Sequence, residues 1–316
     1  MARVRLVAVV ALLLALTVVP SAAPSAVGQQ RVLVILGTSG ATPYTIGNVQ
    51  DVARAAADFY RGSSFGQLNL QFDITPWLHA FTADPGCGFT SQSSFDQLVQ
   101  PARLAAQHAG YRPSEYPRLV YILADSRCAF FGTTWGQEIT LTREPSLELL
   151  VHELGHTFGL GHAGTASCAD GCDVMEPGDP YSPMGTGDRL LDFSTYEKVV
   201  LGWLPAQAKV TGNGRYLLAP ASRDGPGRHA LVIDTNHGEW WIEYRAKPFR
   251  GLLVRFVDVL HPTPTFALGP ILMLNPTHHH RNWIARGETY RADGFTVRLL
   301  RGGSAQAQVQ IHFVGS

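Results

Sequence analysis

Hydrophobic and polar positions divide the chain into two parts with different periodicities. Up to about residue 205, buried-strand runs at 31–36 and 118–124 alternate with helical spacing at 48–60 and 95–109, and residues 68–72 alternate with period two. Strands that alternate with helices predict an α/β layer with a mixed sheet. Residues 134–141 are predicted to form a short edge strand of that sheet, near the next helix.

Beyond residue 205 the helical spacing is lost. Short apolar or alternating runs follow one another, separated by Gly, Pro, Asn and Asp, at 216–219, 230–233, 240–244, 252–257, 271–274, 295–300 and 307–313. This spacing is typical of a β-sandwich. We therefore expect an α+β protein, with a first domain at 29–205 and a smaller all-β, sandwich-like domain at 206–316.

The first 28 residues have the pattern of a secretory signal peptide. Arg3 and Arg5 precede an apolar run from 6 to 19, interrupted only by Thr17, and small residues follow it. A run of this length is short for a membrane span, which needs about 20 residues, so an uncleaved anchor is the less favoured alternative. The sequence predicts a secreted, extracellular protein without a membrane segment after cleavage.

Composition narrows the classes of partner. The chain has 25 Lys and Arg against 25 Asp and Glu, and 45% of its residues are hydrophobic. A formal charge of zero gives no overall field to attract nucleic acid or an anionic bilayer, and the apolar content excludes wholesale disorder. We expect neither nucleic acid nor membrane as a partner.

Four cysteines follow the predicted leader: Cys87, Cys128, Cys168 and Cys172. An even number in an exported protein favours two disulfides. Cys168 and Cys172 are close enough to close one small loop, which leaves Cys87 to pair with Cys128. A thiolate metal site is the alternative, but the paired CxxC spacing of a zinc ribbon is absent.

The strongest chemical signal lies in residues 146–162, which read SLELLVHELGHTFGLGH. On a helix capped by Ser146, His152 and His156 are four residues apart and project from one face. Glu153 is displaced by about 100° around the axis and can address a water beside the metal. Gly159 can adopt a positive φ and turn the chain, so that His162 reaches the same centre. Three imidazoles leave one zinc position open, as in catalytic sites.

The segment HELGHTFGLGH resembles the HExxHxxGxxH signature of the metzincin zinc endopeptidases. Downstream, YSPMG at 181–185 resembles their Met-turn, and FYRGSSFGQLNL, DITPW and FSTYEKVVLGWL look like the gametolysin-type (M11) peptidases. The resemblance covers most of residues 30–205 and, more weakly, the β-rich tail. It implies a zincin catalytic domain with a mixed sheet and an active-site helix.

Carried over residue by residue, the resemblance implies that His152, His156 and His162 bind zinc and that Glu153 is the catalytic base. Met184 is the implied Met-turn residue; Met175 competes for this role, but the compact turn SPMG favours Met184. Some metzincins have a tyrosine two residues after that methionine, where this chain has Thr186, and only Tyr181 and Tyr196 remain as weak substitutes for such an accessory group. The first core strand begins almost at the predicted cleavage site, which leaves no room for a propeptide.

Three further groups of residues can each be interpreted either as a binding site or as ordinary structural positions. Asp170, Asp173, Glu176 and Asp179 offer oxygen ligands for calcium but lack an ordered calcium-loop spacing, so an exposed acidic loop is favoured. The consecutive His278, His279 and His280 point in divergent directions in any regular element, which favours an exposed loop over a second metal site. Trp240, Trp241 and Trp283 are interpreted as sandwich aromatics rather than a carbohydrate platform.

The sequence thus predicts a secreted zinc-dependent endopeptidase. Its substrate would be a protein or peptide, and the resemblance points to extracellular glycoproteins. A zinc-activated water with Glu153 as general base would hydrolyse a peptide bound beside the strand at 134–141. The alternative is an extracellular binding or adhesion protein with a structural zinc site, for which a carboxylate beside an open metal position would have no use.

Overall fold

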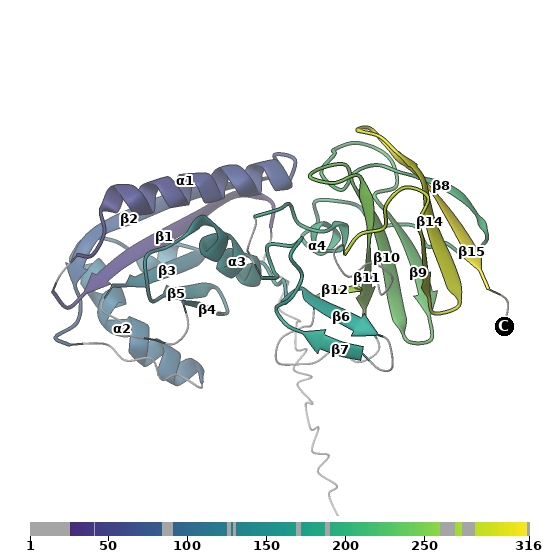
Figure 1. Ribbon diagram of the computed structural model, residues 1–316. Coiled ribbons are helices and arrows are strands. Elements are labelled where there is room, and N and C mark those ends of the chain that lie inside the picture. The colour runs from purple at the N-terminus through teal and green to yellow at the C-terminus, as the bar shows by residue number, and fades with distance from the viewer. Residues whose placement is uncertain are drawn as a thin grey trace, which may run out of the picture.

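The computed structural model describes residues 26–40, 42–83, 91–124, 128, 131–168, 172–186, 190–259, 269–273 and 282–314. Residues 1–25 of the predicted signal peptide, Cys87, Asp170 and the run His278–His280 lie outside them. Within the described part, no helix has both the length and the apolar character that a membrane span requires. The protein contains several sheets and few helices, which confirms the predicted α+β class (Figure 1).

The first part of the chain is built on a five-stranded mixed sheet. Its strands are β1 (Gly28–Thr38), β2 (Leu68–His79), β3 (Arg118–Leu123), β4 (Gly132–Trp135) and β5 (Glu138–Leu141), in the order β2-β1-β3-β5-β4. All neighbours are parallel except β4, which is antiparallel to β5. The single edge strand expected at 134–141 is wrong, because Gly136 adopts φ +60° and folds the segment into a hairpin. Of the two strands of this hairpin, β4 lies at the edge of the sheet and β5 lies inside it.

Helices cover both faces of this sheet (Figure 1). The side chains of β1 alternate, so Val32, Val34 and Leu36 pack with α1 (Ile46–Ser63) and α3 (Leu147–Thr157). Leu33 and Ile35 point to the other face and pack with α2 (Gln92–His108). A short 3₁₀ turn, η1 (Pro113–Glu115), leads into β3. The two helices expected from periodicity are therefore present, and α3 lies on the α1 face.

The second part of the chain forms two packed sheets. The first, in the order β7-β6-β12-β11-β10-β9, contains β6 (Gly164–Cys168), β7 (Cys172–Met175), β9 (Ala230–Thr235), β10 (Gly238–Arg245), β11 (Gly251–Val257) and β12 (Ile271–Met273). The second, in the order β13-β14-β15-β8, contains β8 (Gly214–Leu218), β13 (Thr289–Ala292), β14 (Phe295–Gly302) and β15 (Ala307–Phe313). One apolar core, with residues such as Ile242, Val254, Val297 and Val309, joins the two sheets.

The six-stranded sheet extends across the predicted boundary at residue 205. Its hairpin β6–β7 precedes that boundary, and β6 pairs in parallel with β12. The short helix α4 (Thr195–Val200) lies between the two parts, where Tyr196 and Val199 pack against Val232 and Trp241. The two parts of the protein are therefore joined by a shared sheet as well as by the chain.

Candidate metal centre

Helix α3 begins and ends where the local sequence predicts. The Ser146 hydroxyl accepts a hydrogen bond from the Leu149 amide, which caps the first turn. Leu150, Val151 and Leu154 are buried against the sheet and fix the rotation of the helix. After the C-cap at Phe158, Gly159 adopts φ +91° and reverses the chain. These features turn one face of α3 towards the segment that follows it.

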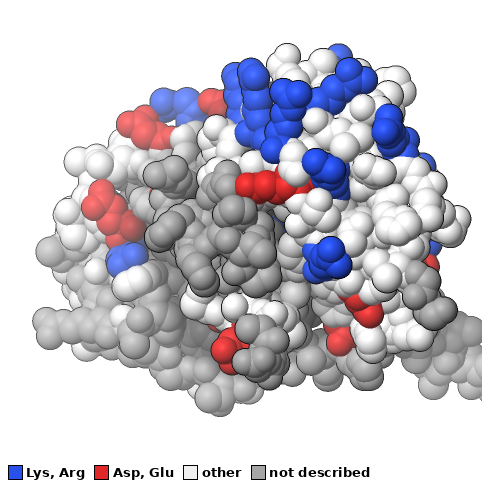
Figure 2. Space-filling model, turned by 45° about the vertical axis from the view of Figure 1, so that its right-hand side comes forward, with Lys and Arg blue, Asp and Glu red and all other residues white. Residues whose placement is uncertain are grey.

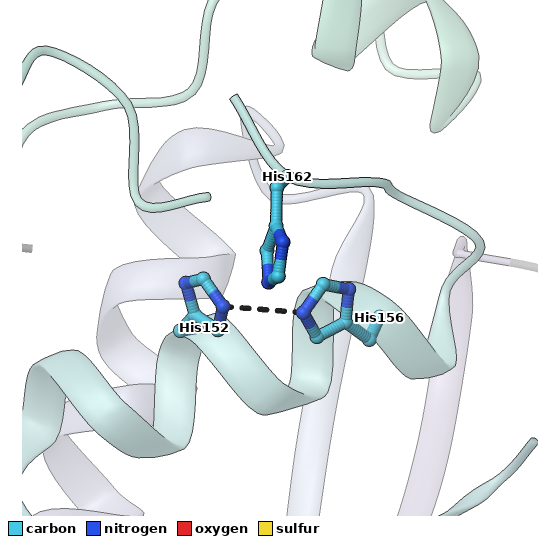
Figure 3. A group of neighbouring side chains, drawn as sticks. All are labelled: His152, His156 and His162. Carbon is cyan, nitrogen blue, oxygen red and sulfur yellow. Dashed lines mark hydrogen bonds between the residues drawn. The ribbon is translucent and has the colours of Figure 1, made fainter. Parts of the chain in front are cut away.

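Three imidazoles converge on that face. His152 and His156 project from α3, and His162 points towards them from the segment beyond Gly159 (Figure 3). One ring nitrogen from each of the three lies within 4.8 Å of the others. The sequence prediction that these rings lie together is therefore met, and this group could hold a metal ion.

The outer ring nitrogens of the two helical histidines are held by backbone carbonyls. His152 Nδ1 lies 2.9 Å from the Pro183 carbonyl oxygen, and His156 Nδ1 lies 2.8 Å from the Leu160 carbonyl oxygen. A carbonyl only accepts, so each Nδ1 carries the proton and each Nε2 keeps its lone pair. At the third histidine, Glu176 Oε1 lies 3.5 Å from His162 Nδ1. Such outer contacts orient metal-binding imidazoles.

The inner nitrogens then form an arrangement that suits a cation. His152 Nε2 and His156 Nε2 lie 3.1 Å apart (dashed line in Figure 3). With both protons on Nδ1, two lone pairs face each other at this distance, and a shared cation would satisfy both. Burial lowers the pKa of each of the three histidines to about 4, so the rings are neutral near pH 7, as ligands must be.

Glu153 is held beside the three rings by strand β4. The Thr134 hydroxyl lies 2.7 Å from Glu153 Oε2, and the Glu153 side chain is buried. Burial raises the pKa of Glu153 to about 7, although the Thr134 hydrogen bond lowers it. A Cβ at Gly132 would lie 2.7 Å from Glu153 Oε1, so the strand approaches the carboxylate closely only because this residue is glycine.

The carboxylate and two of the rings open into one cleft. Glu153, His156 and His162 line a cavity of about 410 Å³ together with Gly132, Thr133 and Thr134 of the edge strand. The position beside the imidazoles is therefore accessible from solvent. An acid, a possible cation site and the last strand of the sheet border the same space.

Met184 lies directly beneath the helix. It is fully buried, and a Cβ at Gly155 would lie 2.3 Å from its sulfur, so the glycine between Glu153 and His156 allows this contact. The Met184 carbonyl accepts a hydrogen bond of 2.7 Å from the Ala163 amide, next to His162. Met175, the competing methionine, is 58% exposed on β7. Of the two methionines, Met184 is thus the one that lies under α3.

The turn that carries Met184 is tied to the C-terminal sheet by buried ion pairs. Asp179 Oδ2 lies 2.8 Å from Arg255 Nε on β11, and Arg255 Nη1 lies 2.7 Å from Glu243 Oε1 on β10. Glu243 also binds Arg245 at 2.7 Å. Burial raises the pKa of Glu243, but the two guanidinium groups outweigh it and lower the pKa to about 2. Glu243 is therefore ionised inside the protein.

The C-terminal sheet also fixes the third histidine. Gly269, just before β12, donates its amide proton to the His162 carbonyl at 2.8 Å, and a Cβ at Gly269 would lie 2.4 Å from that oxygen. Sequence reasoning did not find this glycine, nor Gly132, Thr134, Arg255 and Glu243. A local pattern gives no signal for them because each acts on a residue distant in sequence.

The other residues singled out from the sequence have structural roles where the structure describes them. Cys168 and Cys172 form a disulfide, as predicted. Cys128 is disulfide-bonded as well, and its predicted partner Cys87 lies outside the described residues. Trp240 and Trp241 are buried, and Trp283 stacks on Phe249 at 4.5 Å.

The acidic group does not gather into a calcium site among the described residues. Asp179 is buried against Arg255, Glu176 approaches His162, and Asp173 is exposed on β7. Of the two tyrosines considered as accessory groups, Tyr181 packs on Phe249 and Tyr196 on Trp241. Their contacts are those of packed aromatic side chains.

Comparison with known proteins adds no family assignment. No protein-family model matches the chain, and no curated protein matches it. One solved structure, described as "Structure of a chaperone-substrate complex", is similar over 54% of this chain, with 12% sequence identity and a TM-score of 0.37. The match spans only 30% of that chain, and a TM-score this low assigns neither fold nor function. The resemblance to gametolysin-type peptidases stays a prediction.

Proposed function

We propose that this protein is a secreted zinc-dependent endopeptidase of the metzincin type, similar to the gametolysin-type peptidases. One observation carries the proposal: three neutral imidazoles converge, and two of them, His156 and His162, border the same open cleft as the Glu153 carboxylate. A site of this composition hydrolyses peptide bonds in the enzymes that the motif HExxHxxGxxH resembles. Export follows from the predicted signal peptide, and Met184 would be the Met-turn residue.

The donor set fits zinc well. His152, His156 and His162 offer three nitrogen ligands with outer hydrogen-bond partners, and zinc in catalytic sites commonly takes three protein ligands and leaves one position open. When bound, zinc would supply Lewis acidity and make a water molecule nucleophilic near neutral pH. Calcium is disfavoured because it prefers oxygen ligands.

Glu153 has the position of a general base. Thr134 holds its carboxylate at the cleft. Glu153 follows His152 in the sequence and lines the same pocket as the rings of His156 and His162. It would take the proton of the attacking water and pass it to the leaving amine. General acid–base catalysis by one such group contributes about 10²–10⁴-fold to a rate.

The substrate would lie extended along β4. This strand forms the end of its sheet, and its residues Gly132, Thr133 and Thr134 border the cleft. An extended peptide can add to such an edge through main-chain hydrogen bonds, which fix its direction without requiring a particular side chain. A protein substrate, including extracellular glycoproteins, fits this mode of binding.

The substitution Glu153→Gln tests the proposal. It keeps the shape of the side chain and its contact with Thr134 but removes the base, so kcat on casein or gelatin should fall by about 10²–10⁴-fold while the metal content is unchanged. Glu148→Gln, on the first turn of the same helix, is the matched control and should retain full activity.

Two results would contradict the proposal. Glu153→Gln with wild-type activity would remove the carboxylate from the mechanism. A purified wild-type protein that holds one metal ion per chain but cleaves neither protein nor a peptide library would favour the alternative, an extracellular binding protein with a structural metal.

A further inference from the structure

The overall neutrality of the chain conceals a separation of charge. Residues 206–316 contain 13 Lys and Arg against 7 Asp and Glu, whereas residues 1–205 contain 12 against 18. The C-terminal β region is therefore basic and the rest of the chain is acidic. A surface field can exist locally even though the formal charge is zero.

Much of the excess positive charge lies at one end of the sandwich. The loops after β8, β10 and β14 and the segment before β13 meet there: Tyr244 Oη donates to the Gly303 carbonyl at 2.9 Å, Arg223 donates to the Ala305 carbonyl at 3.0 Å, and Leu252 bridges to Ile284. We call this surface the basic end and define it by Arg223, Arg228, Lys247, Arg250, Arg286 and Arg301. All six are exposed except Arg228, which is half-buried. Figure 2 shows Lys and Arg side chains gathered over the upper part of this region.

None of these six side chains has an ion-pair partner among the residues that the structure describes. Three exposed arginines of the N-terminal part differ from these six, since Arg54, Arg61 and Arg112 each pair with a carboxylate three residues away. The two carboxylates of the basic end are turned to their own loops. Asp224 accepts from the Gly225 amide and Glu288 from the Ala285 amide. The positive charge of this surface is thus left for an external anion.

The loops of the basic end are held in place by packing. Phe249 stacks on Trp283 at 4.5 Å and meets Tyr181 edge-to-face at 5.0 Å, which fixes the loop that carries Lys247 and Arg250. The Arg228 guanidinium lies over the Tyr216 ring at 5.3 Å. Because the backbone of these loops is already ordered, binding an anion there costs less conformational entropy than ordering a mobile loop would.

We propose that the basic end binds an anionic polysaccharide, with sulfate or carboxylate groups held by the unpaired arginines. The planar guanidinium group matches the geometry of both anions through two parallel hydrogen bonds. The aromatic rings of this surface pack on one another, whereas single-stranded nucleic acid is bound by rings on which bases can stack. None of the six residues lines the cleft at the metal centre, so a bound polymer would leave that cleft open.

The test measures binding of the full exported chain to dextran sulfate, with uncharged dextran and a DNA duplex as comparison ligands. A variant with Arg250→Gln, Arg286→Gln and Arg301→Gln should weaken the affinity for dextran sulfate at least tenfold at low salt. The slope of log K against log salt should become less steep by about two to three, because the variant makes three fewer contacts to the polymer and its binding therefore releases fewer counterions. The matched control carries Arg54→Gln, Arg61→Gln and Arg112→Gln, which remove the same charge from the other part, and should change the affinity less than twofold.

The outcomes are distinct. Failure to bind dextran sulfate, or an equal loss in the control variant, overturns the proposal. Tighter binding of DNA than of dextran sulfate at equal charge assigns the surface to nucleic acid and also overturns it. Cleavage of a short uncharged peptide should be the same in wild type and in both variants, and this readout separates the surface from the proposed peptidase.

Discussion

The two parts of this protein use charged side chains in opposite ways. The N-terminal part pairs several of its arginines on the surface, as in Arg54–Asp51 and Arg61–Asp58, where both partners are largely exposed. Among the described residues, the C-terminal β region leaves many surface arginines without a carboxylate, and its arginine ion pairs lie in the interior, where Arg255 joins Asp179 and Glu243. The interaction energy of an ion pair therefore differs between the two parts, because water screens the exposed pairs and does not screen the buried ones.

The two parts also contribute different residues to the candidate metal centre. All three imidazoles and Glu153 come from one stretch of the first part, but the backbone that supports them is fixed from the second. Gly269 binds the His162 carbonyl, and Arg255 binds Asp179 at the start of the turn that carries Met184. Because one part supplies the ligands and the other supports their backbone, changes in the two parts should affect metal binding to different degrees.

The largest effect is expected from removing a ligand. His156→Ala takes away one of the two nitrogens that face each other at 3.1 Å, and the metal affinity should fall by more than 100-fold, because even loss of an outer-shell partner costs about 10–100-fold. Metal content per chain and competition with a chelator measure this. His108→Ala, at the exposed end of α2, is the control. Unchanged metal content in His156→Ala would show that this histidine is not a ligand.

A change at the buried ion pairs should be next in size. Arg255→Met leaves Asp179 as a buried carboxylate without its cation and Glu243 with Arg245 alone, and breaking such a pair costs about 3–5 kcal/mol of unfolding free energy. Urea unfolding measures the loss. Arg103→Met, at the half-exposed pair with Glu138, is the control and should cost much less. The supporting role also predicts weaker metal binding in Arg255→Met than in Arg103→Met at a temperature where both are folded; equal affinities would contradict it.

Sequence patterns were sufficient to predict how the three histidines lie together, but not which distant residues hold them in place. Ser146, Gly159 and the three histidines act within one helix and its terminus, so spacing alone defines how they lie. The alternating runs likewise predicted most strands of the sandwich. The strand β13 was missed because it is only four residues long and follows a polar turn.

Long-range contacts left no local signal. Arg255 interrupts the apolar run of β11, and its charge predicts an exposed position, yet it is buried because Asp179 and Glu243 pair with it inside the protein. Pairing of β6 with β12 could not be predicted either, since more than 100 residues separate the two strands. What decides these features is tertiary packing, which periodicity does not report.

A smaller effect is expected where α3 rests on the methionine. Gly155→Ala places a methyl group in the space of the Met184 sulfur, and overpacking of this kind costs about 1–3 kcal/mol. Met184→Ala in the same chain should recover part of the loss, so the double variant should be more stable than the sum of the single changes predicts. Gly62→Ala on α1 is the control: nothing lies within 4 Å of its added methyl, and it should stabilise the protein slightly. Strict additivity of the Gly155 and Met184 changes would contradict the contact.

The smallest effects distinguish the two surfaces. Arg54→Gln breaks an exposed pair three residues apart and should cost less than about 0.5 kcal/mol. Arg298→Gln on β14 breaks no ion pair among the described residues; it loses an exposed hydrogen bond from Nε to the Gly287 carbonyl at 3.1 Å but reduces repulsion within a basic region, so the change should be close to neutral. Because both effects are electrostatic, both should shrink towards zero as salt is raised, which unfolding curves at two ionic strengths can measure. If Arg298→Gln instead destabilised the protein as much as Arg54→Gln, the C-terminal arginines would be paired after all, and the contrast between the two parts would be lost.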